Sequence, residues 1–166
     1  MAGTDLYPVA GSKIYIGAAK ATQPADFTAS DFSAVSWTLI DGWSQMGVVG
    51  DAAQVITTSI INRGRDTKQK GTRNAGSMQN EFAVISGDAG QTALIAAEGT
   101  SSNYAFKIEF DDAATAPASP APTPTIKYFV GLVTSAQEKG GAANTVRTLT
   151  GTIEINSNIV TVPKNP

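Results

Sequence analysis

The chain has 166 residues, of which 42% are hydrophobic and only 16% are charged, and its net charge is -2. It contains no cysteine and no histidine, which excludes disulfides, thiolate metal sites and a serine–histidine–aspartate triad, and removes the usual general base near neutral pH. The length fits one domain, residues 1–166, whose surface is largely polar but uncharged; because such a surface is buried at lower cost than a charged one, the composition favours a structural assembly subunit over an enzyme.

β-Strand patterns follow one another along most of the chain. Strands are expected at 13–16, 36–40, 54–62, 79–86, 104–110, 126–136 and 147–155. The strand 104–110 alternates most regularly, with aromatic and aliphatic side chains on one face and Lys107 and Glu109 on the other. The sequence therefore predicts a mainly β domain.

Two tryptophans lie at the end of the second expected strand. Trp37 belongs to the strand and Trp43 to the turn after it. A large aromatic side chain with one polar N–H more often anchors a core or a subunit interface than it stacks on a ligand. We interpret both tryptophans as anchors of this kind.

The polar segment 62–78 is expected to be a long loop and is strongly basic. Its cations are Arg63, Arg65, Lys68, Lys70 and Arg73, against the single acid Asp66. The segment carries +4 in a chain of net -2, so the rest carries -6. No aromatic residue is present to stack on bases. Docking on an acidic surface of another subunit is therefore favoured over nucleic-acid binding and over a merely solvated loop.

One short helix is expected at about 88–98. Asp88 is suited to be the N-cap, Gln91 stands three residues later as in a capping box, and Gly99 ends the run. A helix of this length needs a sheet or a barrel end to pack against, which we assign to Leu94 and Ile95.

The last third of the chain holds a proline-rich connection, a strand and a tail. The acidic group at 109–112 lacks the ligand spacing of a calcium loop and is interpreted as a charged strand end. The connection 113–125 contains four prolines and is expected to be an extended surface loop. In strand 147–155, Thr150, Thr152 and Glu154 oppose an apolar face that Gly151 interrupts, which predicts a bulge or a close backbone approach there. Residues 157–166 form the expected C-terminal tail.

The order of these features resembles one protein family. The run WTLIDGW at 37–43 is followed by a strand, by RGR at 63–65 and KGTRNAG at 70–76, by another strand, and by GDAGQTAL at 87–94 opening the helix. Each motif is degenerate, but the ordered combination is similar to the tail tube (major tail) proteins of long-tailed, siphovirus-type bacteriophages. The resemblance runs from about residue 12 to residue 155.

The resemblance implies a β-sandwich or barrel-like subunit with one flanking helix. Six copies would form a ring, and stacked rings would form the tube that delivers the genome into the host. The long loop 62–78 would reach a neighbouring subunit or ring. A conduit for DNA is expected to be lined by small polar or acidic groups, for which Lys107, Glu109, Thr150, Thr152 and Glu154 are the candidates.

The same resemblance sets the expected partners and location. The chain would bind copies of itself, a tape measure protein, and tail tip and tail terminator proteins, and double-stranded DNA would pass through without specific binding. No cofactor, no metal and no membrane contact are expected. The protein would be made in the host cytoplasm and reside in the virion tail.

Three alternatives remain open at this point. The first is a virion decoration or adhesin-like β-sandwich module, and the second is a tube subunit like the haemolysin-coregulated protein of type VI secretion. The third, a carboxylate-based glycan hydrolase, is disfavoured because no acid pair is accompanied by an aromatic cleft in this short chain.

Overall fold

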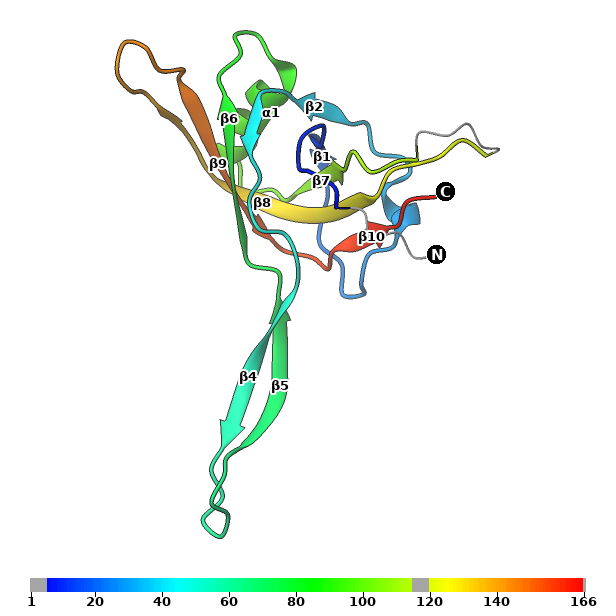
Figure 1. Cartoon of the computed structure of the whole chain (residues 1–166), viewed down its shortest axis with the longest axis vertical. Coiled ribbons are helices and arrows are strands. Elements are labelled where there is room, and N and C mark those ends of the chain that lie inside the picture. Colours follow the sequence, from blue (N-terminus) through cyan, green and yellow to red (C-terminus); the bar gives the residue numbers. More distant parts are fainter. Residues whose placement is uncertain (1–5, 115–119, 166) are drawn as a thin grey trace.

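The computed structural model describes residues 6–114 and 120–165 and shows a mainly β fold with one α-helix (Figure 1). The elements in chain order are β1 (Lys13–Ala19), the 3-10 helix η1 (Ala29–Phe32), β2 (Thr38–Ile40), β3 (Trp43–Gln45), β4 (Ala52–Thr58), β5 (Thr67–Asn74), β6 (Ser77–Ala83), α1 (Ala89–Glu98), β7 (Tyr104–Glu109), β8 (Ile126–Lys139), β9 (Thr148–Ile155) and β10 (Val160–Val162). The expected mainly β class with one flanking helix is confirmed.

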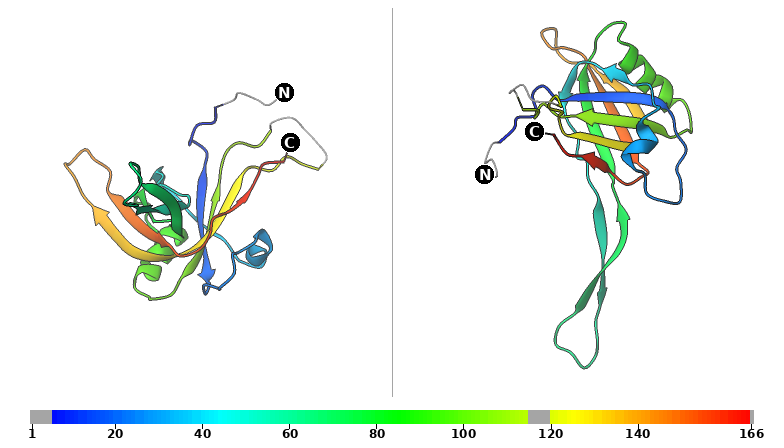
Figure 2. Two further views of the ribbon diagram at one scale, coloured as in Figure 1. Left: turned by 90° about the horizontal axis from the view of Figure 1, so that it is seen from below. Right: turned by 90° about the vertical axis from the view of Figure 1, so that its right-hand side faces the viewer.

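Eight strands form one antiparallel sheet in the order β2-β1-β7-β8-β9-β6-β3, with β10 paired to β8. The sheet is curved and does not close into a barrel (Figure 2). Strand β8, which has 14 residues, joins the two halves: its first part pairs with β7 and β10, and its second part pairs with β9. The register shifts between Val133 and Ser135, a bulge of the kind that bends a strand.

The main core lies between one face of the sheet and α1. Its fully buried members come from β1, β2, β6, β7, β8, β9 and α1: Ile14, Ile40, Met78, Phe82, Leu94, Phe106, Ile108, Phe129, Leu149 and Ile153. Two glycines allow the helix to come this close. A Cβ on Gly151 would lie 2.9 Å from Leu94 Cδ2, and a Cβ on Gly90 would lie 2.0 Å from the Leu39 carbonyl oxygen. At Gly151 the register shows no bulge, and the close neighbour is the Leu94 side chain and not another backbone.

The helix begins as the sequence predicts, but Gln91 acts differently. Asp88 is the N-cap and its carboxylate accepts a hydrogen bond from the Gln91 N–H at 2.7 Å. The Gln91 side chain turns inward and is 4% exposed instead of completing a capping box. The expectation that Ile95 packs on the sheet beside Leu94 is wrong: Leu94 is buried and Ile95 is 45% exposed, because one helical step of about 100° turns it away from the sheet.

A second, smaller cluster covers the other face of β1, β7 and β8. The connection between β1 and β2 places Phe32 against the Tyr128 ring, with centroids 5.1 Å apart, and Trp37 stands 5.8 Å from the same ring. Phe27 and Val130 complete the buried part. Trp37 is therefore an anchor within the chain.

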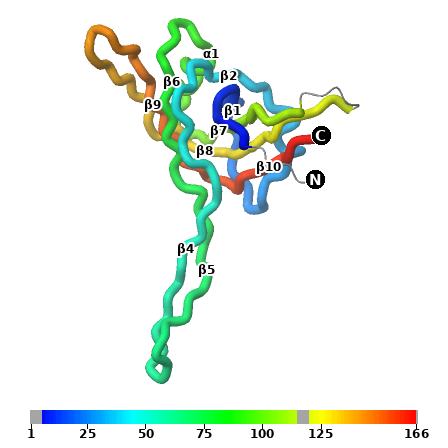
Figure 3. The backbone as a smooth tube through the Cα atoms, in the orientation of Figure 1, coloured from blue at the N-terminus to red at the C-terminus, as the bar shows by residue number. Residues whose placement is uncertain are grey.

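The segment 62–78 is not one long loop, which corrects the prediction. Its residues Thr67–Asn74 form β5, which pairs with β4 as a two-stranded antiparallel ribbon. We call residues 52–74 the arm; it projects from the body of the molecule (Figures 1 and 3). The arm has water on both faces, so it shows no apolar alternation, and that is the pattern by which strands are found in sequence.

The two ends of the proline-rich connection and the C-terminal segment lie together (Figure 2). Part of this connection, 115–119, lies outside the described residues. At its base, the Asp112 carboxylate accepts hydrogen bonds from the Thr125 N–H at 2.7 Å and hydroxyl at 2.6 Å. The expected tail 157–166 contributes β10, and Asn165 pairs with Thr123. Over the described residues, no helix has the length and apolar character needed to span a membrane.

The Asp112 contact makes stability depend on pH. Partial burial alone raises the pKa of Asp112, but the Thr125 hydrogen bonds and the charge of Lys164 outweigh it and hold the pKa below its usual value. This stabilisation is present above the unfolded pKa of about 4 and is lost as the pH falls through the folded pKa. We expect Asp112→Asn to lower the thermal unfolding midpoint at pH 7, and the difference from wild type to shrink at about pH 2.5.

The neighbouring, exposed Asp111 provides the control for this prediction. Asp111→Asn should leave the midpoint at pH 7 nearly unchanged, since surface substitutions away from such contacts usually have small effects. Equal losses for Asp112→Asn at both pH values would contradict the assignment.

Candidate assembly surfaces

The strands β6, β9 and β8 present one continuous polar face. Cross-strand pairing places Thr150 between Glu81 and Gln137, and Thr152 between Gln79 and Ser135. Paired residues in a sheet share a face, so these side chains lie together. We call this surface, with Glu154 at its end, the polar sheet face.

The alternation of side chains along β9 explains why the polar sheet face is not covered by the helix. On β9, Leu149, Gly151, Ile153 and Ile155 are buried on the helix side, and the residues between them are half-exposed. Thr150, Thr152 and Glu154, which were predicted from sequence to share a face of this strand, thus lie on the polar sheet face.

Lys107 and Glu109 occupy a different environment. They lie on β7, where the aromatic cluster covers the sheet. Lys107 Nζ is 3.4 Å from Glu109 Oε2 and 4.0 Å from the centre of the Tyr15 ring, and its side chain is 14% exposed. Burial, and then the charge of Glu109, raise the pKa of Tyr15. The structure therefore does not bring this pair together with Thr150, Thr152 and Glu154.

The arm carries a basic face on β5. Its cations Lys68, Lys70 and Arg73 pair with Thr57, Val55 and Ala53, which alternate along one face of β4. A register shift on the β5 side, between Lys70 and Arg73, returns Arg73 to the face of the two lysines. Three of the five predicted cations thus form one stripe, the basic face. The structure shows no ion pair for them among the described residues.

The other two predicted cations lie in the turn at the end of the arm, residues 59–66, which we call the tip. The Arg63 N–H donates to the Ile60 carbonyl at 2.9 Å, and Ser59 Oγ donates to Asp66 Oδ1 at 2.7 Å. These two hydrogen bonds close the turn. Arg63 and Arg65 are exposed on it.

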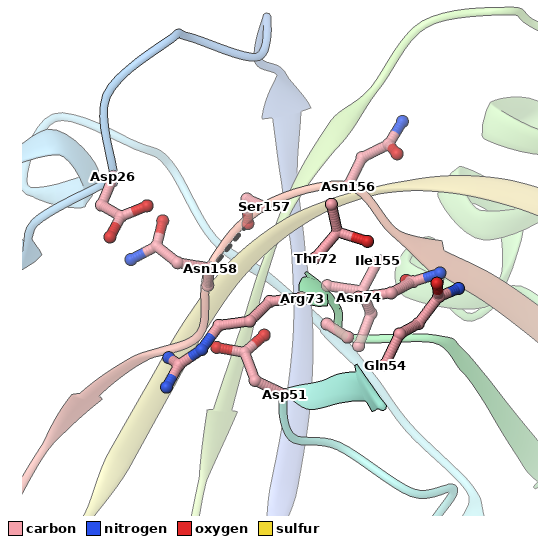
Figure 4. Close-up of a pocket in the computed structure, with 11 residues that line it drawn as sticks. Asp26, Asp51, Gln54, Thr72, Arg73, Asn74, Ile155, Asn156, Ser157 and Asn158 are labelled. Carbon is pink, nitrogen blue, oxygen red and sulfur yellow. Dashed lines mark hydrogen bonds between the residues drawn. The ribbon is translucent and has the colours of Figure 1, made fainter. Parts of the chain in front are cut away.

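A polar cavity of about 480 Å³ lies where the arm joins the body (Figure 4). Arg73 and Asn74 reach it from β5, Asp51 and Gln54 from the other side of the arm, and residues 155–158 from the end of β9. The cavity therefore lies between the root of the arm and the end of β9.

Asn80 holds the segment that leads from β3 toward the arm, and sequence reasoning did not find it. It is fully buried on β6, and its Oδ1 accepts hydrogen bonds from Trp43 Nε1 and from the Gly47 N–H, both at 3.1 Å. Trp43 is thereby an anchor of the segment that leads into β4. The available signal in the sequence was the polar residue Asn80 between Met78 and Phe82 on the apolar face of an alternating strand, because a buried polar side chain needs hydrogen-bond partners.

Replacing Asn80 should release this segment. Asn80→Ala leaves two partly buried N–H groups without their acceptor, at a cost of about 1–3 kcal/mol in the free energy of unfolding. Hydrogen exchange at 46–50 should accelerate, because the acceptor of the Gly47 N–H is lost. Gln79→Ala, on the exposed face of the same strand, is the matched control and should change neither quantity. Unchanged exchange in Asn80→Ala would contradict this role.

One edge of β8 is open. Strand β7 pairs with β8 only from Ile126 to Gly131, so across the described chain no strand pairs with 132–139 on that side. An open edge is a template for pairing with another chain. The sheet thus offers a polar face and an open edge at the same place.

These features define a class of fold: an open, curved antiparallel sheet with one flanking helix and a protruding hairpin. No family model and no curated protein sequence matches the chain. Among solved structures, it is similar to a chain in the sheath/tube terminator of the PVC extracellular contractile injection system, with a TM-score of 0.66 and 10% identity, covering 98% of this chain and 99% of that one.

Two further structures show the same fold. A chain of the anti-feeding prophage baseplate, which was six-fold symmetrised, has a TM-score of 0.65 and 11% identity, and the match covers 96% of this chain and 98% of that one. The SPP1 tail tube has a TM-score of 0.63 and 13% identity, with 94% and 80% covered. The chain therefore has the fold of tail tube and contractile injection system proteins over nearly its whole length.

Proposed function

We propose that this chain is the tail tube subunit of a long-tailed bacteriophage, with a structural and not a catalytic role. The observation that carries the proposal is the polar sheet face next to an open strand edge, in a chain that shares its fold with the SPP1 tail tube. A tube subunit needs both: an edge that continues the sheet into the next copy, and a face that water and DNA can pass.

In this proposal six copies form a ring through edge-to-edge contacts. An interface whose two sides differ closes into a ring when its rotation allows, and the six-fold symmetrised baseplate structure supports six copies. The polar sheet face, with Thr150, Thr152 and Glu154, lines the channel. These three side chains carry no positive charge, and the Glu154 carboxylate repels phosphates, so double-stranded DNA passes without being held. The lining role predicted for Lys107 and Glu109 stays a prediction.

The arm makes contacts between subunits. Its basic face, and Arg63 and Arg65 at the tip, dock on acidic residues of an adjacent copy, whose charge outside 62–78 is -6. A two-stranded ribbon is marginally stable on its own in water, so the arm gains order from such a neighbour.

The remaining partners follow from the same role. A tape measure protein would set the tube length, and tip and terminator proteins would close its ends; structural similarity to a sheath/tube terminator and to a tube-terminating cap supports such contacts. The subunit would be made in the host cytoplasm and reside in the virion tail.

A second candidate is the tube subunit of a contractile injection system. The match to the PVC terminator chain covers 99% of that chain, against 80% of the SPP1 tail tube. The two functions differ in cargo and in the presence of a contractile sheath around the tube.

Negative-stain electron microscopy of the purified protein tests the proposal. We expect rings or tubes with a central channel, and nuclease-protected DNA in particles from the producing cell. The tube function would be overturned if the protein stayed monomeric at high concentration and formed no particles when mixed with the tape measure, tip and terminator proteins. A contractile sheath around the tube, without DNA, would favour the second candidate.

A further inference from the structure

The tip of the arm ends in an exposed apolar pair. Ile61 is fully exposed and Ile60 is 38% exposed. Arg63 and Arg65 follow after Asn62 in the same turn. Burying an isoleucine side chain stabilises a contact, because its apolar surface is removed from water. An apolar pair flanked by two cations at the end of a projecting ribbon is therefore suited to enter an apolar cavity with an acidic rim.

The body holds a cavity of this kind, of about 320 Å³, between the start of β1 and the turn from β2 to β3. Leu39, which is 38% exposed, and Trp43 supply its apolar surface. Asp41 is exposed on its lining, and the Asp111 carboxylate lies against Gly11, which also lines it. Lys13 is the one cation among the lining residues and Asp41 is the one acid. The Asp111 carboxylate beside Gly11 brings the local charge to -1.

The tip and this cavity lie at opposite ends of the molecule. The arm points away from the body at one end, and β2 with the turn to β3 lies at the other (Figures 1 and 2). The tip therefore does not reach the cavity of its own chain. A contact between opposite ends of identical copies repeats along an axis, as the stacking of rings requires.

We propose that the tip of one copy binds in this cavity of a copy in the next ring. Ile61 packs between Leu39 and Trp43, while Arg63 and Arg65 face Asp41 and Asp111. The inference rests on the proposed function, because it needs copies stacked along one direction. The cavity at the root of the arm does not fit this occupant, since Asp, Asn, Gln, Ser and Thr residues dominate its lining.

Cysteine cross-linking tests this contact cleanly, because the chain has no cysteine of its own. An Ile61→Cys variant is mixed with a Leu39→Cys variant under assembly conditions and oxidised. A disulfide needs Cα atoms about 4.4–6.8 Å apart, so only a close contact is trapped. The matched control replaces Leu39→Cys by Val146→Cys, which is 70% exposed and lies between β8 and β9.

We expect the disulfide dimer of the Ile61/Leu39 pair to exceed that of the Ile61/Val146 pair severalfold, with rings or tubes present in the same sample. Ile61→Ser in the cysteine-free chain should raise the concentration needed for assembly about tenfold. Tubes that form with no excess of the Ile61/Leu39 dimer would overturn the contact and leave the tube function standing. Absence of both tubes and cross-link would overturn the two together.

Discussion

Neutralising the basic face of the arm is expected to impair assembly and leave the fold intact. In the triple variant Lys68→Gln, Lys70→Gln, Arg73→Gln, the exposed stripe loses the charges that would dock on an acidic neighbour. Surface charge pairs contribute about 0.2–1 kcal/mol each, so three of them change the assembly constant by about tenfold. Sedimentation over a protein concentration series should show this, and the dependence of assembly on salt should weaken.

The opposite face of the same ribbon provides a matched control. Thr58→Glu, Thr67→Glu and Gln69→Glu place three negative charges on the other face of the arm, and they change the net charge from -2 to -5, as the first triple variant does. Assembly of this control should be close to that of the wild type. Equal effects of the two triple variants would show that net charge matters and the basic face does not.

Replacing Gln91 by leucine is expected to cause the largest loss of stability. Its buried amide joins three elements: Oε1 accepts from the Ile85 N–H at 3.2 Å, and Nε2 donates to the carbonyls of Asp41 and Ala83 at 2.9 and 2.8 Å. Leucine fills a similar volume but leaves these backbone groups without partners. Since each costs about 1–3 kcal/mol, we expect a loss of about 3 kcal/mol or more in chemical denaturation.

Ile95→Gln, on the exposed side of the same helix, is the control for this prediction. Its effect should stay within about 0.5 kcal/mol. A loss for Gln91→Leu as small as that of the control would mean that water replaces the amide at all three groups. The bridge from α1 to the turn after β2 would then not hold the helix on the sheet.

Local signals made part of the fold predictable. The cap at Asp88 and the alternation on β9 depend on neighbouring residues only, so the helix and the polar sheet face follow from sequence. Strand β5 was missed because an exposed ribbon needs no apolar face. The extra strand β10 was missed because three residues give too short a pattern.

The role of single residues depended on partners distant in sequence. Gln91 was correctly placed at the helix start, but its partner at Asp41 lies 50 residues earlier. Asn80 bonds to residues more than 30 positions away. Lys107 alternates like a solvent-facing residue, yet the connection between β1 and β2 folds over its strand. Such contacts follow from the topology, which local sequence patterns do not specify.

The five cations of residues 62–78 were predictable from the sequence in their number and charge, but not in their arrangement. The composition of 62–78 revealed five cations and their excess charge. The division into a basic face and a tip depended on the register of β4 and β5 and on the shift between Lys70 and Arg73. The sequence therefore located the basic segment and left its geometry open.

A cryo-electron microscopy reconstruction of the assembled protein tests the central claim most directly. We expect rings in which the open edge of β8 pairs with the next copy, and a channel wall that bears Thr150, Thr152 and Glu154. A reconstruction in which these three side chains face the outside of the particle, or one with no central channel, would contradict it.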